Sequence, residues 1–392
     1  MPHAALLQRL LAENGLDPEP LTAALRSKDS VEALKVLGDL AERRYQGRKD
    51  TPSREIVAKL KDAISDAVRG TVSTLWNRDG VSLDPSAPVH EGGFSWVIKV
   101  SFRGEPCALV VPKFTRGDYA ERIAIRSEAG RLLPRSERFS MPRPIRNFDS
   151  PVPACLVSYV TGDNCYPRTF DAAGKPHTTA PGPQPGIEVF RKLGELAAGF
   201  TSVQGERFGK LVNPTYASAT EYLRSHTDVI EKVVLADPSL NLRPYAMTLA
   251  QLQRVVDWVK KDAQDQKVSH MMHGDLSPWN LLHDAATGAW TIVDGDDAKF
   301  GILGEQLGVC LNSMRGNFNR AWIDALLDGY GATTESERRN ALLRGAAYGV
   351  VTYGLTNAAH PWDLTNVEMC RDVAFSYLAP SMALFDELVP AA

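Results

Sequence analysis

The sequence has few cysteines and no long apolar run. Its 392 residues include five cysteines, which stand singly, so neither a disulfide framework nor a metal-binding spacing can be read from them. The apolar stretch near the N-terminus is interrupted too soon for a signal-peptide core, and no later stretch reaches transmembrane length. We therefore expect a cytoplasmic protein without a membrane partner.

A marked excess of charge of either sign is also missing. The chain has 44 basic and 47 acidic residues, which leaves a net charge of -3. A charge this small does not favour nonspecific binding to nucleic acid, so we expect no nucleic-acid partner. The hydrophobic content of 44% is that of a globular protein, and the length predicts two or three folding units.

The hydrophobic pattern divides the chain into three parts. Residues 1–80 repeat apolar residues at helical spacing and predict a helical N-terminal extension. Residues 81–161 change to the period of strands, interrupted by a helix over residues 118–133, and predict a smaller lobe. Residues 162–392 are mainly helical, except for a hairpin over residues 281–293, and predict a larger lobe.

The helices of residues 1–80 are amphipathic, so their apolar faces must cover other apolar surface. We expect these helices either to pack on the smaller lobe or to join two copies in a homodimer. Another protein is the third candidate, and the pattern alone does not choose among the three.

One segment combines the residue types that phosphoryl transfer needs. It runs from His273 through Gly274 and Asp275 to Asn280, and Asp294 follows at the end of the next expected strand. Transfer of the γ-phosphate of ATP needs a carboxylate that deprotonates the acceptor hydroxyl, and oxygen ligands that hold Mg²⁺ against the phosphates. Asp275 suits the base, and Asn280 and Asp294 suit the metal. The alternative is that Asp275 and Asn280 are ordinary turn residues and that His273 packs in the core.

This segment, together with Ile292-Val293-Asp294, resembles the aminoglycoside phosphotransferase and choline kinase group of small-molecule kinases. The resemblance extends from Val89 towards the C-terminus. It implies an α+β fold with the two lobes of a protein kinase, a small antiparallel β lobe and a large helical lobe. It also implies ATP-dependent transfer of phosphate to a hydroxyl of a small molecule, with His273 beside Asp275 in catalysis.

Three positions depart from that family's pattern. Phe200-Thr201 stands where a Leu-His pair is usual, so the histidine is absent. No aromatic residue follows Asp294, which leaves Asp296 either as a further metal ligand or as an exposed turn carboxylate. Glu305 stands where an aspartate often braces the catalytic loop, and it is either such a brace or a solvent-facing residue at a helix N-terminus.

The smaller lobe offers backbone groups for a nucleotide. Gly92 and Gly93 would let the chain approach the phosphates, although a Gly-Gly turn in any hairpin looks the same. Ser158, Tyr159 and Val160 resemble the hinge between lobes, whose backbone would hydrogen-bond adenine. A plain buried strand explains these three residues equally well.

The same lobe offers a lysine for the phosphates. The resemblance assigns this role to Lys113, with Lys99 as the rival and a solvated surface lysine as the alternative. Its expected partner is Glu128, with Glu121 as the rival. The alternative for Glu128 is a local ion pair with an arginine of its own helix.

The sequence does not identify the acceptor. There is no Ala-Pro-Glu tripeptide and no room for a long activation segment between Asp294 and Gly304, which favours a small molecule over a protein acceptor. Residues 163–186 form an expected loop with few acids for a polycationic aminoglycoside. Five aromatic residues suit either a cage for a choline-like cation or, more readily, core packing: Trp322, Tyr330, Tyr348, Tyr353 and Trp362.

A function of a different class also fits the pattern. A nucleotide-binding pseudokinase would act as a scaffold and use the N-terminal helices to hold a partner. The presence of Asp275, Asn280 and Asp294 argues against this alternative, because a scaffold has no need of three such residues and buried carboxylates are costly.

Overall fold

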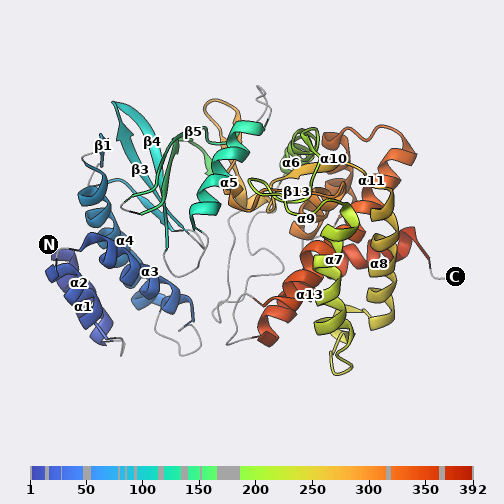
Figure 1. The fold of residues 1–392 in the computed structure, drawn as a ribbon, viewed down its shortest axis with the longest axis horizontal. Coiled ribbons are helices and arrows are strands. Elements are labelled where there is room, and N and C mark those ends of the chain that lie inside the picture. The colour runs from blue at the N-terminus through green and yellow to red at the C-terminus, as the bar shows by residue number, and fades with distance from the viewer. Residues whose placement is uncertain are drawn as a thin grey trace. The chain divides into compact units, whose positions relative to one another are not determined.

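The structure is a computed structural model that describes residues 2–13, 17–27, 29–46, 54–77, 80–83, 86–91, 95–113, 119–133, 140–150, 152–165, 186–314, 319–361 and 367–390. These residues belong to two compact units (Figure 1). Unit 1 comprises Met1–Ser127 and Pro142–Val160, and unit 2 comprises Glu128–Met141 and Thr161–Ala392. Gly92 and Gly93 lie outside the described residues, so their approach to phosphates stays a prediction.

Unit 1 is built on a six-stranded antiparallel sheet. Its long strands, β3 (Ser95–Phe102) and β4 (Glu105–Pro112), pair along their whole length. Shorter strands extend the sheet on both sides: β1 (Val81–Ser82) and β2 (Val89–Glu91) pair with β3, β6 (Ala154–Ser158) pairs with β4, and β5 (Pro144–Phe148) pairs with β6. Pro112 is the last residue of β4, a position at which a strand tolerates proline. The strand pair that the sequence predicts is confirmed.

Four helices precede the sheet in the chain: α1 (Pro2–Glu13), α2 (Glu19–Ser27), α3 (Ser30–Gln46) and α4 (Arg54–Trp76). Their buried apolar side chains share one core with those of the sheet, and this core includes Leu7, Leu21, Leu34, Val68, Trp76, Trp96, Ile98, Leu109 and Leu156. Trp76 of α4 also packs against Phe148 of β5, with ring centroids 6.1 Å apart. Packing of the N-terminal helices on the smaller lobe is therefore confirmed.

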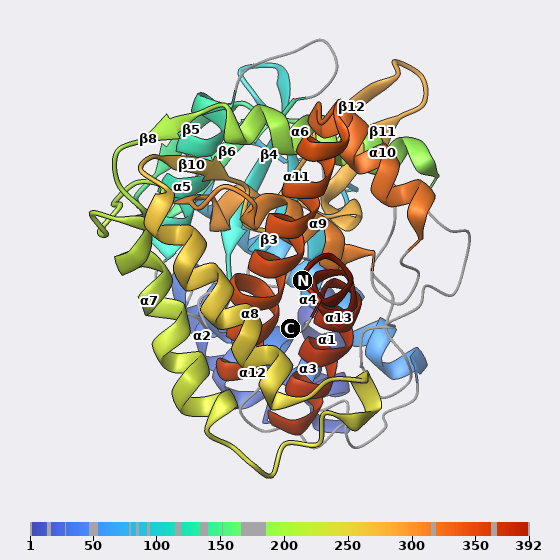
Figure 2. The same ribbon diagram turned by 90° about the vertical axis from the view of Figure 1, so that its right-hand side faces the viewer.

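Unit 2 is mainly helical (Figure 2). Its helices are α6 (Ile187–Thr201), α7 (Ala219–Ile230), α8 (Leu249–Asp262), α9 (Glu305–Ser313), α10 (Arg320–Tyr330), α11 (Glu335–Tyr348), α12 (Thr356–Ala359) and α13 (Val367–Leu388), with π-helical turns at Glu231–Leu235 and Gly349–Leu355. α5 (Tyr119–Leu132) crosses the boundary between the units in sequence. No helix in the described part of the chain is long and apolar enough to cross a membrane.

Two of the four described candidate cage residues, Trp322 and Tyr348, pack in the helical core instead. Phe190 and Trp322 stack between α6 and α10, with ring centroids 4.5 Å apart. Trp322 is 7% exposed and Tyr348 is fully buried. Core packing is therefore confirmed for these two rings, whereas Trp362 lies outside the described residues.

Two small sheets of unit 2 flank the loop from His273 to Asn280, which connects β10 to β11. One has the strand order β8 (Gln204–Gly205), β10 (Ser269–Met272), β13 (Lys299–Gly301), β9 (Gly209–Lys210). The other has the order β12 (Ala289–Ile292), β11 (Leu281–Asp284), β7 (Asp163–Asn164). The β11–β12 hairpin confirms the predicted one, and β10 leads into the segment that begins at His273.

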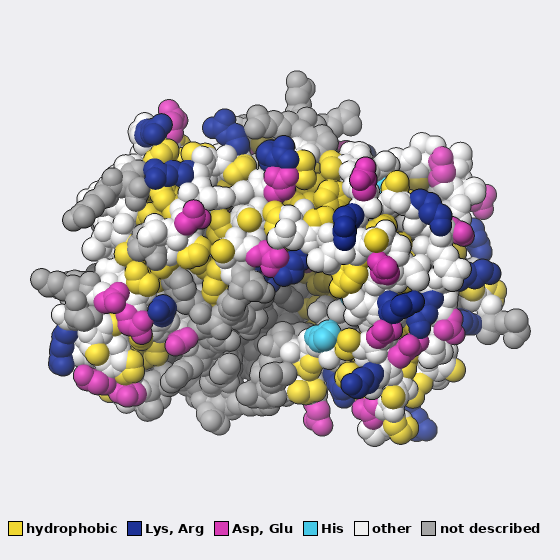
Figure 3. All heavy atoms as spheres, in the orientation of Figure 1, with side chains coloured by type: hydrophobic (Ala, Val, Ile, Leu, Met, Phe, Trp, Pro, Cys, Tyr) yellow, Lys and Arg dark blue, Asp and Glu magenta, His cyan; other side chains and the backbone are white. Residues whose placement is uncertain are grey.

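The surface mixes charges of both signs. On the face drawn in Figure 3, basic and acidic side chains both occur over the described residues, with several acidic side chains close together at the lower left. This distribution agrees with the small net charge of -3.

Candidate active site

A glycine turns the chain as it leaves β10. Gly274 has a φ of +91°, and a Cβ atom at this position would lie 2.4 Å from the backbone oxygen of Asp297. The positive φ and the close approach both exclude a side chain here. Gly274 therefore brings the loop from His273 to Asn280 against the turn that follows Asp294.

The carboxylate of Asp275 is held on one side only. Its Oδ2 accepts hydrogen bonds from Trp279 Nε1 at 3.1 Å and from Asn280 Nδ2 at 3.0 Å. Its Oδ1 is buried and has no hydrogen-bond partner among the described residues. A buried carboxylate oxygen without a donor is costly, which makes this atom a candidate acceptor for a hydrogen bond from a ligand.

The β11–β12 hairpin brings Asn280 and Asp294 together. Leu281 pairs with Ile292 at the end of the hairpin, and Val293 N donates to Asn280 O at 2.9 Å. Asp294 comes next, with the left-handed backbone angles φ 67° and ψ 47°. Such a conformation is uncommon for a residue other than glycine and is often found at functional sites.

The side chains present fit a magnesium ion held jointly with a nucleotide. The Nδ2 of Asn280 donates to Asp275, the other side-chain atom of Asn280 is an oxygen of the type that Mg²⁺ prefers, and Asp294 is exposed. No group of three His, Cys, Asp or Glu side chains in the described ranges is placed to hold a metal ion alone. Mg²⁺ in nucleotide sites usually takes one or two carboxylates and completes its shell with phosphate oxygens and water. Asp296 is 4% exposed, so the exposed-turn alternative for it is wrong.

His273 lies behind the loop. Its side chain is fully buried, and its ring packs edge-on against Phe200 at a centroid distance of 5.4 Å. Neither ring nitrogen makes a well-formed hydrogen bond to another described residue. Burial lowers the pKa of His273 well below its ordinary value, so the ring is neutral near pH 7.

The brace of the loop comes from Gln306 and not from Glu305. Gln306 is 1% exposed, and its Oε1 accepts a hydrogen bond from His273 N at 2.6 Å. Glu305 is 2% exposed, so its solvent-facing alternative is wrong, and its Oε1 accepts from Ile302 N at 2.8 Å. The residue that contacts the loop is therefore Gln306, one position after the expected Glu305. Consecutive residues of a helix point in different directions, so only one of the two can face the loop.

A protein-family comparison identifies the chain. The model of a family described as "Phosphotransferase enzyme family" matches residues 104–342. The chain belongs to this phosphotransferase family. No curated protein matches the sequence of this phosphotransferase.

Solved structures similar to this phosphotransferase include small-molecule kinases. A thermostable mutant of an aminoglycoside phosphotransferase, in a ternary complex with ADP and hygromycin B, has 16% identity and a TM-score of 0.52, over 82% of this chain and 98% of that one. A microcompartment-associated aminopropanol kinase has 16% identity and a TM-score of 0.51, over 81% and 96%. The ethanolamine kinase of Plasmodium vivax has 10% identity and a TM-score of 0.50, over 88% and 96%. These likenesses establish the fold: an α+β, two-lobed, protein-kinase-like architecture.

The two candidate lysines of the phosphotransferase differ in their exposure to solvent. Lys113 is 3% exposed, and its Nζ lies 5.8 Å from the ring centroid of Trp96. Lys99 is exposed and lies over the ring of Tyr159, at 4.6 Å from its centroid. The surface-lysine alternative is therefore wrong for Lys113, whereas it describes Lys99.

Glu128 has a partner on its own helix. Arg131 Nε donates to Glu128 Oε2 at 2.8 Å, and this hydrogen bond is the first cause of the lowered pKa of Glu128. This contact is the local ion pair that stood as the alternative. A pairing of Glu128 with Lys113 stays a prediction.

Two of the three hinge amides are used inside unit 1. Ser158 N donates to Arg143 O at 2.8 Å, and Tyr159 N donates to Pro106 O at 3.4 Å. Val160 directly follows and makes no such backbone bond within the described part of the chain. A role of these three residues in binding adenine stays a prediction.

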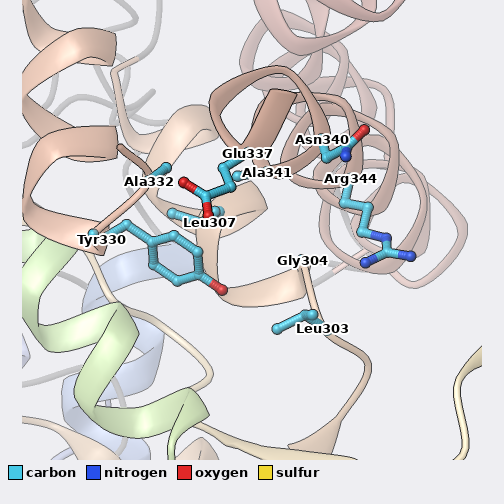
Figure 4. Close-up of a pocket in the computed structure, with 10 residues that line it drawn as sticks. Leu303, Gly304, Leu307, Tyr330, Ala332, Glu337, Asn340, Ala341 and Arg344 are labelled. Atoms are coloured by element: carbon cyan, nitrogen blue, oxygen red, sulfur yellow. The ribbon is translucent and has the colours of Figure 1, made fainter. Parts of the chain in front are cut away.

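A separate pocket of about 330 Å³ lies among the helices of unit 2 (Figure 4). Leu303, Gly304 and Leu307 line it together with Tyr330 and residues of α11. It contains none of the residues that we expected in catalysis or nucleotide binding. Tyr330 is the one candidate cage residue on its wall, so this pocket is not an aromatic cage.

Proposed function

We propose that the protein is an ATP-dependent phosphotransferase that moves the γ-phosphate to a hydroxyl of a small molecule. One observation carries this proposal: Asp275 presents a buried carboxylate oxygen without a donor, while Trp279 and Asn280 hold the other oxygen. This is the arrangement that a general base needs, because it fixes the carboxylate and leaves one atom for the substrate proton.

The reaction follows from this geometry. The acceptor hydroxyl donates its hydrogen bond to Asp275 Oδ1, which orients the hydroxyl oxygen towards the γ-phosphorus of ATP. As the new O–P bond forms and the bond to the β-phosphate oxygen breaks, Asp275 accepts the proton. ADP and the phosphorylated acceptor are the products.

Asn280 and Asp294 are the proposed metal ligands, and Asp296 is a third candidate behind them. Mg²⁺ at this site would neutralise the charge that develops on the phosphate oxygens. Asp294 has a left-handed backbone conformation at the end of the hairpin, and its carboxylate is exposed, so it is accessible to a metal ion. Asn280 contributes twice, since its amide nitrogen orients Asp275 and its oxygen is left for the metal.

Lys113 and the backbone of Val160 are the proposed nucleotide contacts in unit 1. Lys113 is buried, and the ammonium group of a lysine is a common binder of phosphate. The relative crystallised with ADP and hygromycin B supports nucleotide binding by this fold.

The acceptor is proposed to be a small molecule. The chain passes from Asp294 through the short strand β13 to α9 at Glu305, which leaves no space for a long activation segment. The names of similar proteins point to alcohols that also carry an amine, among them hygromycin B, aminopropanol and ethanolamine. We propose the same broad class for this chain.

His273 acts indirectly in this scheme. A fully buried ring that packs on Phe200 has no surface with which to touch an acceptor. We propose that His273 positions Asp275, which stands two residues further along the chain.

The test is a magnesium-dependent ADP-release assay with a panel of amino alcohols, aminoglycosides and a generic protein acceptor. Asp275→Asn keeps the shape of the side chain but removes the base, and we expect kcat to fall by about three orders of magnitude or more with little change in ATP binding. Asp265→Asn is the matched control, because Asp265 is exposed and lies outside the loop, before strand β10. Full turnover by Asp275→Asn would refute the assignment of the base.

Asp294→Asn tests the metal site in the same assay. Asparagine tolerates left-handed backbone angles, so the fold should persist while Mg²⁺-dependent turnover falls by about a hundredfold. Asp296→Asn shows whether the buried carboxylate shares the metal, and a loss smaller than that of Asp294→Asn is expected. Turnover with the protein acceptor alone would contradict the proposed substrate class.

A further inference from the structure

Unit 2 holds a buried cluster of three polar side chains that the phosphoryl-transfer scheme does not use. Lys299 of β13, Glu305 of α9 and Tyr222 of α7 form a closed triangle. Lys299 Nζ lies 2.7 Å from Glu305 Oε2 and donates to Tyr222 Oη at 2.6 Å. Tyr222 Oη donates to Glu305 Oε2 at 3.1 Å. Tyr222 and Glu305 are 3% and 2% exposed and the Lys299 side chain is 25% exposed, so the contacts are largely, though not wholly, shielded from water.

The backbone around the triangle is shaped to admit Glu305. A Cβ atom at Gly301 would lie 2.8 Å from Glu305 Oε1 and 3.1 Å from Met272 Cγ, so a side chain there would displace the carboxylate. Glu305 Oε1 also accepts a hydrogen bond from Ile302 N at 2.8 Å. Both carboxylate oxygens are therefore fixed, and they are fixed at the residue where α9 begins.

Two routes lead from the triangle to the catalytic loop. Through the sheet, Lys299 of β13 pairs with Met272 of β10, the residue before His273. Through the helix, Gln306 follows Glu305, and its Oε1 accepts from His273 N at 2.6 Å. Both routes end at His273, two residues before Asp275.

Stability alone does not explain this arrangement. Well-packed apolar residues of similar volume stabilise a core as well as a buried ion pair does, or better. A buried ion pair differs from apolar packing because its hydrogen bonds have directions, so it permits fewer relative positions of the elements that it joins.

We propose that Lys299, Glu305 and Tyr222 are positioning residues for Asp275: they fix the start of α9 and, with it, the hydrogen bond between Gln306 and His273. This inference rests on the proposed function only where it names Asp275 as the base. The order of the loop can be measured without turnover.

The first experiment is hydrogen exchange on the full chain, read in peptides that contain the His273 amide. Glu305→Gln keeps the length of the side chain and an acceptor oxygen but loses the charge, and Lys299→Met keeps the stem but loses the ammonium group. We expect each variant to speed exchange at His273 by about tenfold, because the opening of the Gln306 contact becomes easier. Gln306→Leu removes the last link and should produce a similar increase with the triangle intact.

The matched controls are Lys192→Met and Glu195→Gln. This second Lys–Glu pair lies on α6, with Lys192 Nζ 3.0 Å from Glu195 Oε2 and side chains 13% and 16% exposed. These variants lose the same groups in the same unit, in an ion pair that lies within α6 and not at the start of α9, so exchange at His273 should stay at the wild-type rate. Unchanged exchange at His273 in folded Glu305→Gln and Lys299→Met proteins would overturn the inference.

Tyr222→Phe covers the case in which the charge variants do not fold. It removes one hydroxyl and leaves the ion pair, so a smaller but measurable increase in exchange at His273 is expected. If this folded variant exchanges like wild type while Lys299→Met and Glu305→Gln fail to fold, the triangle has a structural role only and the inference is wrong.

A turnover arm separates this inference from the proposed function. With the acceptor found by the panel, Glu305→Gln should lower kcat by about tenfold and change the KM for ATP by less than about threefold, because positioning affects the chemical step more than nucleotide binding. Glu305→Ala should lower kcat further, so that glutamine restores part of the rate. Wild-type turnover that needs Asp275 but not Glu305 would leave the proposed function standing and refute the positioning role. Absence of turnover in the wild type would refute the function, while hydrogen exchange still tests the triangle.

Discussion

Asn280 donates one side-chain nitrogen to two oxygens of Asp275, at 2.9 Å to the backbone oxygen and at 3.0 Å to Oδ2. The two residues stand five positions apart, with a 3-10 turn from Pro278 to Asn280 between them. These hydrogen bonds close the loop between Asp275 and Asn280, so that Asn280, the proposed metal ligand, also orients Asp275, the proposed base. A change at Asn280 should therefore affect both functions at once.

Asn280→Asp tests this double role with almost no change in size. The new carboxylate would face Asp275 Oδ2 across 3.0 Å, where an amide donor stood. Two carboxylates at this distance do not ionise together readily, so the acidic limb of the pH–rate profile should move to higher pH, and kcat at pH 7 should fall by about a hundredfold. The measurement is kcat/KM against pH from 5 to 9.

Asn340→Asp is the control for this substitution. Asn340 is exposed on α11, so the same chemical change there should leave the pH–rate profile in place. A profile for Asn280→Asp that coincides with that of wild type would mean that Asn280 does not orient the base.

Gly274→Ala should destabilise the protein strongly. The new methyl group would have to occupy a position 2.4 Å from the backbone oxygen of Asp297, at a φ of +91°. Strain and overpacking together should lower the free energy of unfolding by about 3 kcal/mol or more. Gly288→Ala is the matched control, because Gly288 also has a positive φ but nothing lies within 4 Å of its missing Cβ. Urea denaturation followed by circular dichroism should show a loss of only about 1 kcal/mol for that variant.

The loop from His273 to Asn280 could be found from sequence because its residues lie within one short segment. The β11–β12 hairpin is equally local, and Leu281 pairs with Ile292 as its pattern indicates. The choice between lysines also had a local signal: Ile98 and Val100 are buried, so Lys99 between them points to the other face of β3. The rule of alternation would have removed Lys99 as a rival.

Contacts between segments that are distant in the chain are harder to predict from the sequence. The hydrogen bond from His273 to Gln306 spans 33 residues, and the sequence does not show which of Glu305 and Gln306 faces the loop once α9 begins. Strand β13 has three residues, too few for a periodic pattern, so Lys299 and its link to Tyr222 carried no signal.

His226 should make stability depend on pH. Its Nδ1 lies 3.1 Å from Thr356 Oγ1, and its ring packs edge-on against Tyr222. Burial, and then the charge of Lys299, lower the pKa of His226 to about 4. The unfolded chain therefore binds a proton at His226 more readily than the folded chain does. The stability that the neutral, buried ring contributes is complete above about pH 6.5 and is lost as the pH falls towards 4.

His226→Asn removes this titration and keeps a polar group near Thr356. Between pH 7 and pH 4, wild type should lose roughly 2 kcal/mol more unfolding free energy than the variant does. His90→Asn is the control, because His90 is an exposed histidine on β2 of unit 1 and its replacement should leave the pH dependence nearly unchanged. Parallel curves for wild type and His226→Asn in urea titrations would contradict the assignment.

Leu34→Ala tests whether the N-terminal helices belong to the core of unit 1. Leu34 of α3 is fully buried in the cluster that also contains Trp96 and Leu109 of the sheet. Removal of its side chain leaves a cavity, and a loss of about 2–5 kcal/mol in unfolding free energy is expected. Lys35→Ala, at the next and exposed position, should change stability by less than about 0.5 kcal/mol. Because one core contains both the helices and the sheet, we expect a chain without residues 1–80 to aggregate. If Leu34→Ala lowered the free energy of unfolding of unit 1 no more than Lys35→Ala does, the helices would not belong to this core, and the truncated chain should fold.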